Sequence, residues 1–132
     1  MNIEAHLESL REAFSTIDLC VDKGAENHQR AIGFLTSLGA AEMLELYLHK
    51  SRLLHVSARV HHEWLKSKKR LAEKIPQDFP RKAEILELVY NIEKNRNDFC
   101  YGKKVEASRL RDQLEQFNAL KELFREVGLD EI

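Results

Sequence analysis

Residues 3–21 read IEAHLESLREAFSTIDLCV, and their apolar side chains recur at the period of an α-helix. The spacings are 4, 3, 4, 3 and 4 between Ile3, Leu7, Leu10, Phe14, Ile17 and Val21. Such alternation places side chains on one face of a helix. Asn2 can cap the first turn, and Gly24 can end the helix in a left-handed conformation. The stretch predicts a helix over residues 3–22 that buries one face against a partner.

Four further segments carry a helical signal, at about residues 27–52, 54–74, 81–99 and 105–127. Both prolines lie in residues 75–80, the clearest loop, and Pro80 can start the following helix at its first position. Because the connections are short, neighbouring helices should run antiparallel. The sequence predicts an all-α fold: an antiparallel up-down helical bundle of four to five helices, with residues 1–132 forming a single domain.

The composition is that of a compact globule under a charged surface, with 43% hydrophobic and 33% charged residues. Its 21 basic and 22 acidic side chains leave a net charge of −1, so bulk electrostatics do not draw it to nucleic acid. No apolar run approaches the roughly 20 residues that span a bilayer, and the N-terminus lacks the pattern of a signal peptide. We expect a cytoplasmic protein without membrane contact, whose Cys20 and Cys100 are reduced, packed thiols.

The predicted helix over residues 27–52 carries small residues near its centre: Gly33, Gly39, Ala40 and Ala41. A glycine weakens a helix by about 1 kcal/mol relative to alanine. Two of them therefore indicate a close helix–helix crossing or, alternatively, a break near Gly39. We also expect this small-residue patch to contribute to a subunit interface.

One position breaks the apolar pattern of the predicted helix over residues 81–99. Its inward positions, spaced 4, 3, 4 and 3 apart, are Ile85, Val89, Ile92, Arg96 and Phe99. Burying a guanidinium is costly unless it is paired. Arg96 would be satisfied by a salt bridge, by a position at the bundle end where it reaches solvent, or by a cleft or interface that receives an anion. The candidate salt-bridge acids are Glu42, Glu45 and Asp98.

Residues 93–102 read EKNRNDFCYG, in which an Arg-Asn pair is followed by Tyr-Gly. This segment resembles the motif on a late helix of HEPN domains (higher eukaryotes and prokaryotes nucleotide-binding), in the branches that carry Arg-Asn-x-x-x-Tyr-Gly. The resemblance implies a homodimer with the motif in its cleft, an RNA or nucleotide ligand, and a toxin–antitoxin or nucleotidyltransferase-associated system with a nucleotidyltransferase partner. The site residues that it implies are catalytic Arg96 and Tyr101 and substrate-binding Asn97, Asp98 and Lys103.

Tyr101 stands where many HEPN ribonucleases have a histidine, four to six residues after the arginine. Metal-independent RNA cleavage suits a group that titrates near neutrality, and a histidine has an ordinary pKa of about 6.5 whereas that of a tyrosine is about 10. The sequence therefore favours anion binding by Arg96, and leaves open a weak or degenerate metal-independent endoribonuclease. Five residues span roughly 140° around a helix. Tyr101 thus joins Arg96 only if the helix unwinds or if it reaches the other subunit, and Cys100 is the better same-face neighbour.

Two further patterns carry weaker signals. Glu42, Glu45 and His49 lie at positions i, i+3 and i+7, but no Glu-x-x-His pair stands on another predicted helix to complete a di-metal site. We expect solvated surface groups there, no metal site and no cofactor. The basic run in residues 59–70 is either a stripe that binds a nucleic-acid backbone or, as we favour, a solvated charged face.

Three functional hypotheses follow. The first is a HEPN-like homodimer that binds RNA or a nucleotide phosphate at Arg96. The alternative, from a different class, is a non-catalytic helical protein-interaction module in which Arg96 forms a structural salt bridge. The third is a ribonuclease that uses Arg96 with Tyr101 or with a nearby histidine.

Overall fold

A computed structural model describes residues 2–132, and that part of the chain contains helices and no strand. The bundle is formed by four long helices: α1 (Ile3–Asp22), α2 (Gln29–Lys50), α5 (Lys82–Lys94) and α7 (Ala107–Glu126). Shorter elements connect them: η1 (Ala25–Asn27), α3 (His62–Leu65), α4 (Lys68–Lys74) and α6 (Arg96–Tyr101). The predicted all-α bundle is confirmed.

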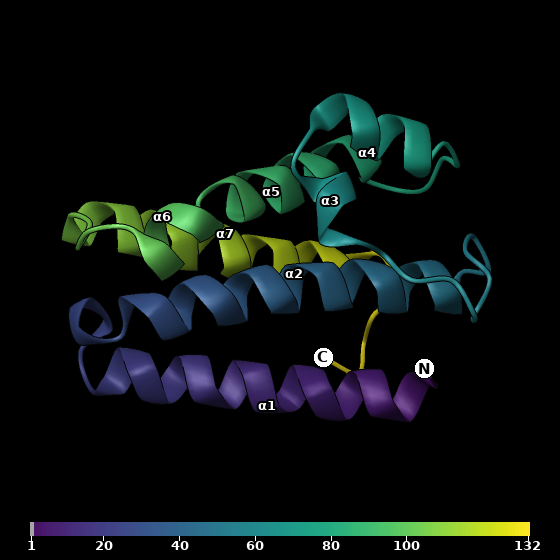
Figure 1. Ribbon diagram of the computed structural model, residues 1–132. Coiled ribbons are helices and arrows are strands. Elements are labelled where there is room, and N and C mark those ends of the chain that lie inside the picture. The colour runs from purple at the N-terminus through teal and green to yellow at the C-terminus, as the bar shows by residue number, and fades with distance from the viewer. Residues whose placement is uncertain (1) are drawn as a thin grey trace.

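The long helices alternate in direction along the chain, and α2 lies among them (Figure 1). Helix α2 contacts α1, α5, α6 and α7. By length and composition it could cross a membrane, contrary to our expectation that no segment would reach that threshold, but 67% of its most apolar window is buried inside the bundle. The central position in the core accounts for its apolar character, since a helix enclosed by others is hydrophobic on every side.

The two glycines of α2 mark close helix crossings. A Cβ on Gly33 would lie 2.7 Å from Cβ of Phe99 in α6, and a Cβ on Gly39 would lie 2.8 Å from the ring of Phe117 in α7. Helix α2 is continuous through both positions, so the crossing is confirmed and the break near Gly39 is wrong. Because both glycines pack within the chain, they are not a subunit interface.

The buried face of α1 is rotated from the predicted one. Ile3 and Val21 are exposed, whereas His6, Ala13 and Cys20 are buried. The buried side chains include a second seam with the spacing 4, 3, 4 and 3, formed by His6, Leu10, Ala13, Ile17 and Cys20. Helix α1 packs against α2, and a buried histidine occupies the first position of this second seam.

The predicted helix over residues 54–74 is wrong in its first half, because residues 51–61 form a loop before α3 and α4. Side chains of α2 hold this loop: Nε2 of His49 donates to the carbonyl of Ala58, and the amide of Val60 donates to the carboxylate of Glu45. These bonds satisfy backbone groups that a helix would otherwise pair. Ser67 then caps α4 by accepting a hydrogen bond from the amide of Arg70.

The remaining expectations concern the start of α5 and the thiols. Pro80 does not occupy the first helical position, because Arg81 intervenes in a left-handed conformation with φ of 62°. Cys20 and Cys100 are free and buried, as expected. Cys20 belongs to a small buried cluster with Ile32, Phe99 and Leu110, in which the fully buried Phe99 anchors α6 against α2 and α7.

Candidate anion-binding surface around Arg96

A break at Asn95 separates α5 from α6, so the predicted helix over residues 81–99 is two helices. The side chain of Gln113 in α7 enters the break. Its Nε2 donates to the carbonyl of Ile92 and to Oγ1 of Thr36, both at 3.1 Å, and its Oε1 accepts from Nδ2 of Asn95 at 3.1 Å. Gln113 is fully buried. The buried side-chain amide of Gln113 therefore replaces helical hydrogen bonds that are lost at the break, and it fixes the direction in which α6 continues from α5.

Arg96 is the first residue of α6 and is only half-buried. Its guanidinium carbon lies 5.5 Å from the centre of the Phe34 ring on α2. Within residues 2–132 it forms no salt bridge, since Glu42 and Glu45 face His6, and Asp98 pairs with Arg109 at 3.2 Å. The predicted buried seam position is wrong, and the salt bridge, one of the three alternatives for Arg96, is not formed within the described residues. The break turns Arg96 outward, onto an aromatic ring.

Tyr101 lies on the same ring as Arg96. Its side chain packs edge-on against Phe34, with ring centres 5.7 Å apart at 89°. Tyr101 is 66% exposed and Phe34 is 38% exposed. The two motif residues therefore flank one aromatic side chain of α2, although they stand five positions apart in a helix. Sequence reasoning missed Phe34, because nothing in the motif indicates which residue of α2 lies beneath it.

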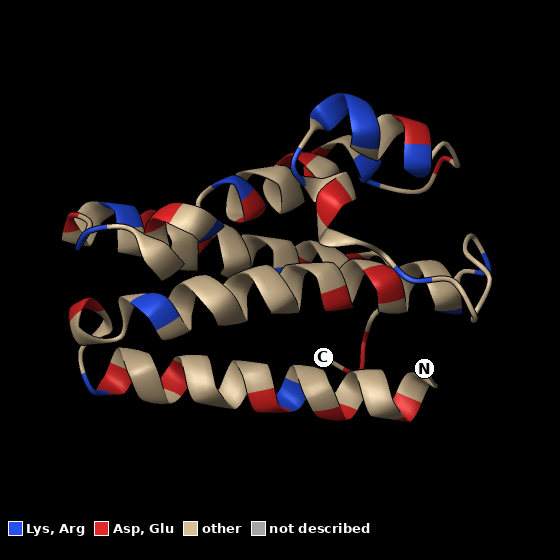
Figure 2. Ribbon diagram, viewed as in Figure 1, with Lys and Arg blue, Asp and Glu red and all other residues tan. Residues whose placement is uncertain are grey.

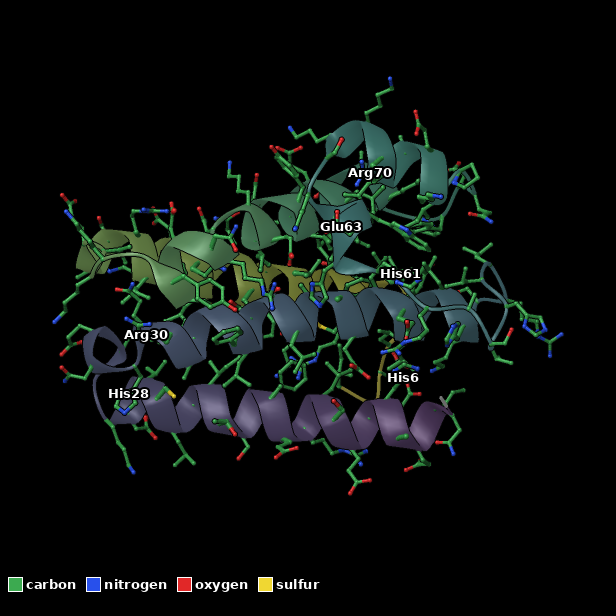
Figure 3. The ribbon with its side chains drawn as sticks, in the orientation of Figure 1. His6, His28, Arg30, His61, Glu63 and Arg70 are labelled. Carbon is green, nitrogen blue, oxygen red and sulfur yellow. The ribbon has the colours of Figure 1, made fainter. Side chains whose placement is uncertain are left out.

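Arg30, one turn before Phe34 on α2, adds a second cation near this surface. Its guanidinium donates to the carbonyl of Cys100 at 3.1 Å, near the C-terminal end of α6 where carbonyl groups lack helical partners. Figure 3 shows Arg30 near the start of α2, on the side of α6. Burial raises the pKa of the Cys100 thiol, and the positive charge of Arg96 opposes that rise. Cys100 is thus a packed thiol close to Arg96.

The other predicted site residues lie apart from this ring. Asp98 and Lys103 line a hollow of about 470 Å³ together with Arg109, and neither Arg96 nor Tyr101 lines it. Asn97 is exposed. The structure therefore divides the predicted site into two groups: Arg96 and Tyr101 on Phe34, and Asp98 and Lys103 in the hollow. A second hollow beside the motif, lined by Arg30 and Gly102 among others, is not lined by Arg96 or Tyr101 either.

A histidine reaches the start of the motif from another element. Nδ1 of His62, at the start of α3, lies 3.2 Å from both oxygens of the Glu93 carboxylate. Glu93 is 4% exposed and accepts a hydrogen bond of 2.5 Å from Oγ of Ser37. The buried carboxylate of Glu93, which stands three positions before Arg96 in the chain, thus orients the partly exposed imidazole of His62. Sequence reasoning placed His62 only in the basic run of residues 59–70.

That basic run is a charged face with acidic partners (Figure 2). Lys66 and Arg70 both pair with Glu63, and Lys68 pairs with Glu87 on α5. All five side chains are largely exposed. The arrangement favours the solvated face over a stripe that binds a nucleic-acid backbone.

The acids and histidine of α2 are not solvated, contrary to our expectation. Glu45 and His49 are buried, and Glu42 is half-buried. They surround His6, which the apolar seam predicted for α1 did not include. The sequence signal that could have identified His6 as buried is the second seam of α1, in which this histidine holds the first position.

Comparisons with protein families, with curated proteins and with solved structures find no match to this chain. The assignment of function therefore rests on the sequence motif and on the geometry of these side chains.

Proposed function

We propose that the chain is a HEPN-like helical homodimer that binds RNA or a nucleotide phosphate through Arg96. The observation that carries the proposal is a half-buried guanidinium that lies over the Phe34 ring and has no carboxylate partner in residues 2–132. An arginine offers a planar fork of donors that matches a phosphate bidentately. The cation–π contact uses none of these donors, so they remain for an anion.

The groups around Arg96 suit a nucleotide better than a bare anion. Tyr101 is exposed and can stack with a base, since every base has a π-face and such stacking is sequence-tolerant. Arg30 supplies a second positive charge near the C-terminal end of α6. The net charge of −1 makes such a local patch necessary for binding a polyanion.

The second copy of the chain would cover the exposed apolar side chains on this side of α2 and α6. Phe34, Leu38 and Tyr101 are all more than a third exposed. A dimer formed there would place two copies of Arg96 near one another and form a cleft between the two chains. In this proposal the protein is cytoplasmic and belongs to a toxin–antitoxin or nucleotidyltransferase-associated system, with a nucleotidyltransferase as its partner.

Catalysis is the smaller part of the proposal. Tyrosine is a poor base near neutral pH, so we expect weak cleavage or none. The nearby histidine of the ribonuclease hypothesis is His62, which the Glu93 carboxylate orients as carboxylates orient catalytic imidazoles elsewhere. Tyr101→His should raise cleavage only if the other groups already stand in place.

The rival interaction module now lacks its structural salt bridge. Removing one partner of a buried pair would cost about 3–5 kcal/mol, whereas an exposed cation–π contact contributes about 0.5–1 kcal/mol. Arg96→Ala should therefore retain the parent's helical content and lose little stability. A large loss of stability would favour a structural role for Arg96.

The direct test is binding of a fluorescein-labelled single-stranded RNA, and of a labelled nucleotide, by fluorescence anisotropy. We expect Arg96→Ala to weaken binding by at least about fivefold, because a good bidentate contact contributes about 1–3 kcal/mol and 1.4 kcal/mol corresponds to a factor of about ten. The matched control is Arg11→Ala, which removes an exposed arginine of α1 and should change the affinity little. A parent that binds neither probe, or equal losses in the two variants, would refute the proposal.

Light scattering tests the dimer separately. The parent should have about twice the 15.4 kDa mass of one chain. Leu38→Glu should give monomers, because it places a carboxylate in the proposed apolar interface. A monomeric parent at high micromolar concentration would remove the intersubunit cleft.

A further inference from the structure

Three side chains with metal-ligating atoms meet in the core at the far end of α2 from Arg96. They are His6 of α1 and Glu45 and His49 of α2, and their exposed fractions are 0%, 8% and 5%. One ligand atom from each lies within 4.8 Å of the others. Figure 3 shows His6 between α1 and α2. His49 is 15 positions beyond Phe34, which is roughly 22 Å along a helix, so this cluster is separate from the Arg96 surface.

The outer atom of each side chain is held by a hydrogen bond. Nδ1 of His6 lies 2.6 Å from Oε1 of Glu42. Nε2 of His49 lies 2.8 Å from a carbonyl oxygen of the loop after α2, and Oε1 of Glu45 accepts from an amide of the same loop at 2.6 Å. The inner atoms that remain are Nε2 of His6, Nδ1 of His49 and Oε2 of Glu45.

The partners of the outer atoms determine where the imidazole protons lie. A carbonyl oxygen only accepts, so Nε2 of His49 carries the proton and Nδ1 presents a lone pair. In the same way Nδ1 of His6 donates to the Glu42 carboxylate, and a neutral ring then presents a lone pair at Nε2. These two inner nitrogens are the buried side-chain polar atoms without a hydrogen-bond partner in residues 2–132. Nε2 of His6 lies 3.3 Å from Oε2 of Glu45, but the two are not aligned for a hydrogen bond.

Two lone pairs and a carboxylate oxygen, buried together without a donor, destabilise the fold unless a cation lies among them. We propose that Nε2 of His6, Oε2 of Glu45 and Nδ1 of His49 bind one divalent transition-metal ion. Imidazole suits zinc, copper, iron and nickel, and two histidines with one glutamate form a known zinc ligand set that leaves a position open.

The geometry fits such an ion. Tetrahedral ligands at about 2.0–2.2 Å from zinc lie roughly 3.4 Å from one another, and the nitrogen of His6 and the oxygen of Glu45 are 3.3 Å apart. A hollow of about 430 Å³, lined by Asn2, Ile3, His49 and Val56, lies beside the site and shares one ligand residue, His49, with it. In this proposal the ion and a water as the fourth ligand enter from that side.

In this proposal the hydrogen bonds to the outer atoms orient the two imidazole rings toward the ion. Metal-bound histidines usually donate their other ring N–H to a carboxylate or a backbone carbonyl, which orients the ring. Glu42 and the Ala58 carbonyl occupy these two positions. An ion at this site would tie α1 to α2 and, through His49 and Glu45, hold the loop of residues 51–61.

The rival explanation is a proton in place of the ion. A doubly protonated His6 would lie between Glu42 and Glu45, and its Nε2 would then form an ion pair with Oε2 of Glu45, 3.3 Å away, without an aligned hydrogen bond. It would leave Nδ1 of His49 buried without a partner. A metal ion would give a partner to all three inner atoms. A proton would give one only to Nε2 of His6 and Oε2 of Glu45.

Titration calorimetry with zinc on the untagged, chelator-treated full chain separates these explanations. We expect one ion per chain, and cobalt at the same site should give the visible absorption bands of a tetrahedral complex. Changes to outer partners of metal sites cost about 10–100-fold in affinity, so His49→Gln, which removes a ligand, should cost at least about 100-fold. The control is His61→Gln, which removes an exposed histidine and should leave the affinity unchanged.

Absence of stoichiometric binding by the parent would overturn the proposal, as would equal losses in the two variants. Since His49 is buried, its variant could fail to fold. X-ray absorption of the zinc-loaded parent then decides, because two imidazoles in the first coordination shell support the site and fewer than two refute it.

Discussion

Gly33→Ala tests the close crossing that positions the Arg96 surface. The added methyl would lie 2.7 Å from Cβ of Phe99 and 3.0 Å from Sγ of Cys100. A Cβ atom is tied to the backbone, so α6 must move away from α2. Overpacking of this kind costs about 1–3 kcal/mol, and the better helix propensity of alanine returns about 1 kcal/mol. We expect a net loss of about 1 kcal/mol and a Tm lower by about 4 °C.

The accompanying assay is labelling of Cys100 by a thiol reagent in a Cys20→Ser background. Cys100 is 1% exposed, and burial raises the pKa of its thiol, so the parent should react slowly at pH 8. Displacement of α6 in Gly33→Ala should speed the reaction. Gly39→Ala is the matched control, because its methyl meets the Phe117 ring of α7 and should lower Tm without exposing Cys100. A Gly33→Ala variant that is more stable than its parent, with Cys100 still protected, would refute the reasoning.

Three further outcomes test local features of the bundle. Gln113→Leu removes the hydrogen-bond partners of Nδ2 of Asn95 and of the Ile92 carbonyl, and the bond to Oγ1 of Thr36, and should cost at least about 2 kcal/mol in urea unfolding. Asn2→Ala removes the side-chain cap of α1 and should cost about 1 kcal/mol in the same measurement. The hydrogen bond from Lys50 lowers the pKa of Glu131 below its ordinary 4.5, so their pair stabilises above pH 4.5 and loses that effect as the pH falls through the lower folded-state pKa. Lys50→Met should therefore lower Tm more at pH 6 than at pH 3, by an amount that corresponds to less than about 1 kcal/mol because the pair is partly exposed.

The terminal helices could be predicted from the sequence almost to the residue. Helix α1 has the predicted bounds, and α7 differs by two residues at its start and one at its end. Their apolar periodicity and their end signals are local properties of the chain. A helix with one buried face and one solvent-exposed face shows this periodicity, whatever it packs against. The second seam that begins at His6 can also be read from the sequence. A search for apolar residues alone passes over it, because its first position is a histidine.

The candidate surface was predictable only in part. The motif indicated Arg96 and Tyr101, yet the ring that joins them belongs to α2, and the expected helix seam would have turned Arg96 inward. The break at Asn95 follows from Gln113, which lies 18 positions later and enters from α7. Helical periodicity describes one segment at a time and does not contain such a contact.

The sequence by itself determined that the chain is helical, where its long helices lie and that an arginine interrupts an apolar pattern at position 96, because these depend on residues within a few turns of one another. Only the tertiary structure decided which way Arg96 points and that residues 51–61 are a loop. It also decided that His6, Glu45 and His49 meet. Each of these depends on a buried polar side chain that finds its partner on another element, and the free energy of burying that group overrides the local preference of the segment it contacts.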